Sequence, residues 1–142
     1  MRTVRVVWSL MAVLALVYAV TSTREPVSTV SLGCSKMGRL DFDSAPGADC
    51  DTAIVEVLGI WPFVVLALLL CGQAVVAALV MRRWSSWLAV AAYGGLSFAG
   101  VANWAGFWIL LLVAVPMALV AVVLATVHQF LTLSGSRDVP TR

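Results

Sequence analysis

Apolar residues run along the chain in four long stretches, separated by short groups of charged and polar residues. The uncharged stretches cover 6–23, 57–81, 84–106 and 105–136, and the last two overlap at a turn. A hydrocarbon core of about 30 Å is crossed by roughly 20 helical residues at ~1.5 Å each, so every stretch is long enough to cross a bilayer. The pattern predicts an all-α integral membrane protein with four transmembrane helices.

The boundaries of these helices follow from the polar and turn-forming residues between the apolar stretches. A break is needed after residue 101, because residues 84–136 carry no acidic or basic side chain other than His128. The segment Ala102-Asn103-Trp104-Ala105-Gly106 contains the only Asn of the chain and suits a tight helical hairpin. We predict one membrane domain over 1–142, with helices at about 4–23, 57–81, 84–102 and 105–131. An external loop then occupies 24–56 and a cytoplasmic tail 132–142.

Charge predicts the orientation of the helices. One side carries six basic residues against the single acid Asp138: Arg2, Arg5, Arg82, Arg83, Arg137 and Arg142. The other side has three basic and six acidic residues, a net charge of −3. Since cytoplasmic loops are enriched in Lys and Arg, both termini are expected in the cytoplasm. The Ala and Val bias and the lack of an Asn-x-Ser/Thr site suit a bacterial plasma membrane.

The first stretch has a second interpretation. Arg2 and Arg5 precede a short apolar run, and Val17-Tyr18-Ala19 resembles a signal-peptidase site, so this helix is either retained or cleaved as a signal peptide.

Tryptophan and proline add detail to the spans. All six Trp fall near predicted helix ends, where an indole ring can be buried while its N–H stays wet, and we expect them at the membrane interfaces. Pro62 suits the first turn of the second helix, and Pro116 predicts a kink within the fourth.

Composition excludes several classes of protein. The chain is 62% hydrophobic and 11% charged, too little polar surface for a soluble monomer. Its formal charge of +2 is small and its basic residues are scattered, so we expect no nucleic-acid partner. The expected surroundings are the lipid bilayer and other membrane protein subunits.

Small and polar residues within the spans predict how the helices pack. Close backbone approach needs small side chains, which recur at helical spacing as Ala12, Ala15 and Ala19; Ala91, Gly95 and Ala99; and Ala114, Ala118, Ala121 and Ala125. An Ala-rich chain also produces such spacing by chance. Gln73 and Tyr93 fall at similar depth on antiparallel helices, so we expect them to face protein and to hydrogen-bond each other; a polar substrate path is the alternative. Cys71 is expected to be a buried, reduced filler.

The external loop is predicted to be closed by a disulfide between Cys34 and Cys50, because the outer side of a plasma membrane is oxidising. Four Asp residues lie within eleven positions, at 41, 43, 49 and 51. Their spacing does not match an EF-hand, so a solvated acidic surface is favoured over a bound cation. Asp51 or Thr52 is expected to cap a short helix reaching Glu56.

The sequence predicts no catalytic, cofactor-binding or metal site. Between Val57 and Val127 the only charges are Arg82 and Arg83; there is one His, His128, and no CxxC or Gly-rich phosphate loop. We therefore expect a non-enzymatic accessory or stabilising subunit of a larger plasma-membrane complex. The alternatives are a small homo-oligomeric channel or transporter using Gln73, Tyr93 and Ser97, and a thiol-redox protein using Cys34 and Cys50.

Overall fold

The described part of the chain is helical. The structure is a computed structural model that describes residues 2–38, 47–80 and 82–134. Its long helices are α1 (Arg2–Ser22), α4 (Trp61–Val80), α5 (Arg83–Ala102) and α6 (Ala114–Ser134), the last preceded by the 3₁₀ helix η2 (Phe107–Val113). With η2 counted into the fourth, four helices are long and apolar enough to cross a membrane, as predicted.

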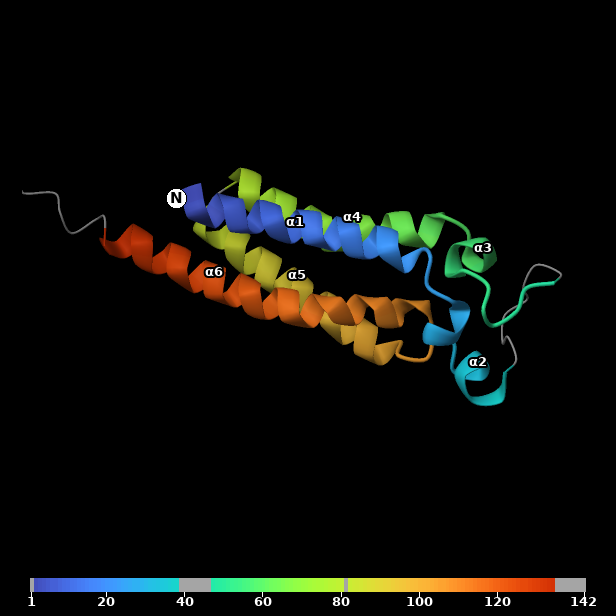
Figure 1. Ribbon diagram of the computed structural model, residues 1–142. Coiled ribbons are helices and arrows are strands. Elements are labelled where there is room, and N and C mark those ends of the chain that lie inside the picture. Colours follow the sequence, from blue (N-terminus) through green and yellow to red (C-terminus); the bar gives the residue numbers. More distant parts are fainter. Residues whose placement is uncertain (1, 39–46, 81, 135–142) are drawn as a thin grey trace, which may run out of the picture.

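The four long helices run side by side, each antiparallel to the next along the chain (Figure 1). α1 packs along α4, α5 packs along α6, and α4 also contacts α5. One end of the bundle, here called the terminal end, carries the starts of α1 and α5 (Figure 1). α1 begins at Arg2, and Arg82 is the N-cap of α5. The opposite end, the loop end, carries residues 23–38 and 47–60 and the turn at Asn103.

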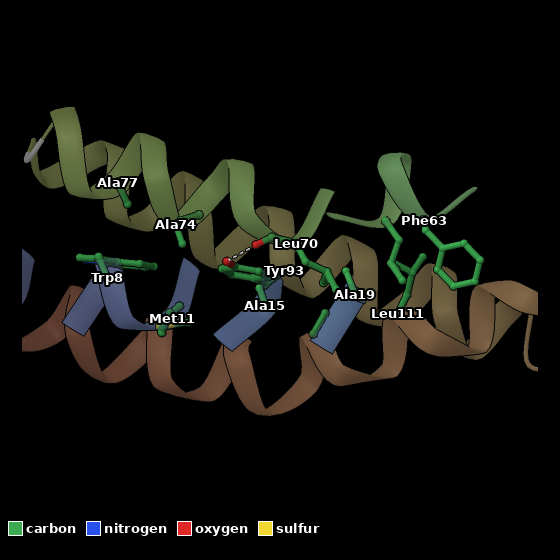
Figure 2. Packing of buried hydrophobic residues seen from close by; sticks show 14 of the residues in the cluster. Trp8, Met11, Ala15, Ala19, Phe63, Leu70, Ala74, Ala77, Tyr93 and Leu111 are labelled. Carbon is green, nitrogen blue, oxygen red and sulfur yellow. Dashed lines mark hydrogen bonds between the residues drawn. The ribbon is translucent and has the colours of Figure 1, made fainter. Parts of the chain in front are cut away.

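The core is a seam of small and large apolar side chains between the helices. On α1 it follows a helical repeat, and α4 presents a matching row, because residues three and four apart share one helix face. The facing residues are Trp8, Met11, Ala15 and Ala19 on α1, and Leu66, Leu70, Ala74 and Ala77 on α4 (Figure 2).

Two predicted helix boundaries differ from the structure. The predicted second helix at 57–81 is divided, because the short helix α3 (Ile54–Leu58) ends at Gly59, whose φ of +75° favours glycine. The predicted fourth helix begins as η2, and Pro116 falls in the first turn of α6 rather than in a helix interior. Its missing N–H therefore coincides with a change of helix type.

The loop end carries a small folded unit, here called the knob, made of residues 23–38 and 47–58. It contains η1 (Val27–Thr29), α2 (Leu32–Met37) and α3. The two arms of the knob pair in antiparallel fashion: the Val27 N–H donates to Thr52 O at 3.0 Å, and the Ile54 N–H donates to Glu25 O at 2.9 Å. Val27 and Ile54 are buried beneath this pairing.

The predicted disulfide is present, and it joins Cys34 in α2 to Cys50 on the other arm of the knob, with 5.5 Å between their Cα atoms. The predicted cap is wrong. Ala53 occupies the N-cap of α3 without a side-chain bond, while Thr52 Oγ1 accepts from the Asp49 N–H at 2.9 Å. The Thr52 hydroxyl therefore closes the preceding turn instead. Asp41 and Asp43, half of the acidic group, lie outside the described residues.

Candidate functional site

Side-chain donors of one helix bond to backbone carbonyls of another at several points in the bundle. The Tyr93 hydroxyl on α5 donates to Leu70 O on α4 at 2.7 Å (Figure 2), and the Cys71 thiol on α4 approaches Ala12 O on α1 at 3.3 Å. An apolar environment makes an unpaired polar group costly, and a carbonyl has a second lone pair to offer. These groups therefore hold helices together.

Two further bonds of this kind lie near the ends of α1. At the terminal end, Arg5 Nε donates to Ala78 O at 3.0 Å, close to the C-terminus of α4, where carbonyls lack helical partners and a cation is favourable. Towards the loop end, the Tyr18 hydroxyl donates to Leu110 O in η2 at 3.1 Å. α1 is thereby bonded to both α4 and the fourth span.

Near the terminal end, α5 and α6 bring together a serine and the single histidine. Ser86 Oγ and His128 Nδ1 lie 3.4 Å apart, and both residues are buried. His128 therefore belongs to the helix interface, rather than to a headgroup-facing surface.

The predicted hydrogen bond between Gln73 and Tyr93 is wrong, because the Tyr93 hydroxyl reaches the Leu70 carbonyl instead. Gln73 Oε1 is enclosed and has no hydrogen-bond partner within the described residues. The Ser97 hydroxyl donates to Tyr93 O on its own helix at 2.8 Å. Gln73, Tyr93 and Ser97 thus form no continuous polar surface, since Tyr93 is fully buried and Ser97 bonds locally.

The predicted packing residues are distributed differently on the two paired helices. On α6, Ala118 is half-buried between the buried residues Ala114 and Ala121. On α5, Ala99 is half-buried, but Gly95 is exposed and a Cβ there would meet nothing within 4 Å. The close approach occurs at a glycine that the prediction missed.

That glycine is Gly100. A Cβ built on it would lie 3.1 Å from Leu112 N and 3.2 Å from Leu111 Cβ, so a larger residue there would push η2 away from α5. Gly100 lies four residues after Leu96 and seven after Tyr93, so it shares their core-facing side of α5. The sequence alone does not show which side of α5 that is.

Five of the six tryptophans have exposed side chains at helix ends or turns, whereas Trp8 is fully buried. Figure 2 shows its ring pointing into the space between α1 and α4, towards Ala74 and Ala77. The expectation that the Trp8 N–H stays wet is therefore wrong. Small residues on α4 create room for the ring, and its Nε1 has no hydrogen-bond partner within the described residues.

A groove lies between α4 and α5, in the half of the bundle nearest the terminal end. Its volume is about 570 Å³, within the roughly 300–1,000 Å³ of small-molecule sites. We call it the α4–α5 groove; its walls include Leu68, Gly72, Gln73, Val76 and Val80 on α4, and Trp84, Ser85, Leu88, Ala89 and Ala92 on α5. Gln73 supplies an amide halfway along an otherwise apolar wall.

A second groove, of about 250 Å³, lies between α1 and the fourth span. Tyr18 lines it, opposite Pro116 and Met117. Within residues 2–38, 47–80 and 82–134, no three His, Cys, Asp or Glu side chains come together as a metal would require. The linings of both grooves are mostly apolar.

Comparison with known proteins gives no match: neither a protein-family model, nor a curated protein, nor a solved structure is significantly similar to this chain.

Proposed function

We propose that the protein is a non-catalytic membrane subunit that docks laterally on other membrane proteins. The observation that carries the proposal is the outer face of α5. Ala91, Gly94 and Gly95 are exposed there, and a Cβ at either glycine would meet nothing within 4 Å. Small residues in a span allow another helix to approach closely, so this face suits a partner helix.

The use of the polar side chains supports the same role. Tyr18, Cys71 and Tyr93 direct their donors to carbonyls of neighbouring helices. Side-chain donors that bond to carbonyls of neighbouring helices are not available to line a path for a solute. This distribution favours a docking subunit over a channel built from Gln73, Tyr93 and Ser97. The disulfide-closed knob adds a second contact surface outside the spans.

The test is affinity purification of the full chain, tagged at the C-terminus and expressed at native level, from mild detergent. We expect a membrane protein to co-elute in stoichiometric amount, and Gly95→Leu to reduce its recovery at least fivefold. Ser9→Leu, also a small-to-large change at an exposed position but on α1, is the matched control and should leave recovery unchanged.

Elution of the chain alone, or only with itself, would contradict the docking role. Flux of small solutes into liposomes carrying the purified protein would then test the channel, and a loss of flux in Gln73→Leu would support it. A thiol-redox role requires Cys34 and Cys50 to cycle between thiol and disulfide in cells, which trapping of free thiols with an alkylating reagent detects.

The proposed location is a plasma membrane, with the terminal end in the cytoplasm and the knob outside. It is supported by the exposed Arg2 and Arg82 at the terminal end and by Glu25, Asp49 and Asp51 in the knob. A fluorescent protein fused to the C-terminus should fluoresce, and alkaline phosphatase fused there should be inactive. The reverse pattern would refute this orientation.

A further inference from the structure

The α4–α5 groove is long and narrow, with the dimensions of one extended hydrocarbon chain. Its wall on α4 runs from Leu68 to Val80, which is about 18 Å at the α-helical rise of ~1.5 Å per residue. Spread over that length, about 570 Å³ gives a mean cross-section of about 30 Å². A helix about 10–12 Å across has a cross-section of roughly 80–110 Å², so it is too wide to lie inside the groove and could only cover its open side.

The charges near one end of the groove indicate which kind of headgroup a bound hydrocarbon chain would carry. The groove ends at Val80 and Trp84, and the exposed Arg82 lies between them in the sequence. Arg2 and Arg5 lie at the same end of the bundle. Every carboxylate in the described part of the chain lies in the knob, at the opposite end. An anionic group at the mouth of the groove is therefore attracted and meets no described carboxylate.

From the apolar walls, the narrow cross-section and the basic mouth, we propose that the α4–α5 groove binds one anionic phospholipid. One acyl chain lies along Leu68, Val76 and Leu88, and the phosphate lies at Arg82. Basic pockets between transmembrane helices are a recurrent form of site for anionic headgroups. None of Ala91, Gly94 and Gly95, the exposed residues proposed for docking, lines the groove, although they lie beside it on α5. Lipid retention by the purified chain does not depend on recovery of a protein partner, so either proposal can fail without the other.

The experiment is native mass spectrometry of the full chain in nonionic detergent. The probes are phosphatidylglycerol and phosphatidylcholine with identical acyl chains, added in equal amounts. We expect one phosphatidylglycerol retained per chain, in clear excess over phosphatidylcholine. Equal retention of the two lipids, or no retention of either, would overturn the proposal.

Two variants separate the roles of charge and shape. Arg82→Gln should lower the preference for phosphatidylglycerol about fivefold, the factor for one basic residue near an anionic surface. The control is Arg24→Gln, at an exposed arginine of the loop end, which should leave the preference unchanged. An equal effect of both variants would show general electrostatic attraction and overturn the site.

Ala92→Phe places a phenyl ring in the groove and should abolish retention, whereas Ser9→Phe, at an exposed position of α1 that lines neither groove, should not. Retention by the Ala92→Phe protein would contradict the proposed place of the acyl chain. A lipid-free dimer that Ala92→Phe converts to monomer would show that a second copy covers the groove, and would also overturn the proposal. Arg82→Gln changes an exposed side chain, so that test stands even if Ala92→Phe does not fold.

Discussion

The hydroxyl of Tyr93 on α5 donates a 2.7 Å hydrogen bond to the backbone carbonyl of Leu70 on α4. Tyr93 is fully buried, and the bond joins two helices whose contact is less extensive than that of α1 with α4 or of α5 with α6. It connects the half of the bundle formed by α1 and α4 to the half formed by α5 and α6. The alignment of the two halves along the bundle axis therefore depends on this bond together with the bond from Tyr18 to Leu110.

Removing the Tyr93 hydroxyl should weaken the bundle without changing its shape. We expect Tyr93→Phe to lower the free energy of unfolding by about 0.6–1.7 kcal/mol, the range for hydrogen bonds between membrane helices. Unfolding by a denaturing detergent, followed by circular dichroism, measures it. Ser97→Ala is the control, because its hydroxyl bonds within α5. Equal loss in the two variants would show that the bond to Leu70 contributes nothing of its own.

Two glycines on α5 should respond oppositely to the same change. At Gly100 an added methyl group meets the η2 backbone at 3.1 Å, so Gly100→Ala should destabilise the protein by about 1–3 kcal/mol. At Gly95 the methyl group meets nothing, so Gly95→Ala should stabilise the helix by up to about 1 kcal/mol. The midpoint of thermal unfolding in detergent should fall for the first and not for the second. The opposite order would refute the assignment of Gly100 as the close contact.

Truncating Trp8 should be far more damaging than truncating an exposed tryptophan. Because Trp8 is fully buried in the seam between α1 and α4, Trp8→Ala should cost about 3–5 kcal/mol of folding free energy. Trp84, 60% exposed, is the control, and its replacement by Ala should cost less than 1 kcal/mol. Detergent unfolding of both variants checks this, and similar losses would mean that Trp8 is not enclosed as described.

Breaking the Cys34–Cys50 disulfide should loosen the knob and leave the helices intact. For a loop of this length, the chain-entropy model gives roughly 3 kcal/mol. We expect Cys34→Ser with Cys50→Ser to be cut faster by protease within the knob, at unchanged helix content. Cys71→Ser, which keeps a donor for Ala12 O, should be cut at the wild-type rate. Unchanged proteolysis of the double variant would show that backbone pairing alone holds the knob.

The features read correctly from the sequence are those that depend on local composition. The spans follow from the length of uncharged runs, and the disulfide follows from two cysteines in the one long segment between spans. Both predictions hold whichever way the helices are rotated about their own axes.

The features that the sequence did not predict depend on that rotation. Nearly every side of these helices is apolar, so the pattern does not say which face turns inward. Gly95 and Gly100 look equivalent in the sequence, and so do Trp8 and Trp84; only the packing of neighbouring helices distinguishes them. The wrong pairing of Gln73 with Tyr93 has the same origin, because equal depth does not ensure that two side chains face each other.

The pairing of the two arms of the knob has a mechanical consequence. Backbone hydrogen bonds join Glu25 to Ile54 and Thr23 to Val55, immediately after α1 and before α4. A force applied to the knob would therefore act on α1 and α4 together. It would reach α5 and α6 only through the contacts between the two halves of the bundle. Binding outside the membrane would thus be transmitted as a tilt of one helix pair against the other.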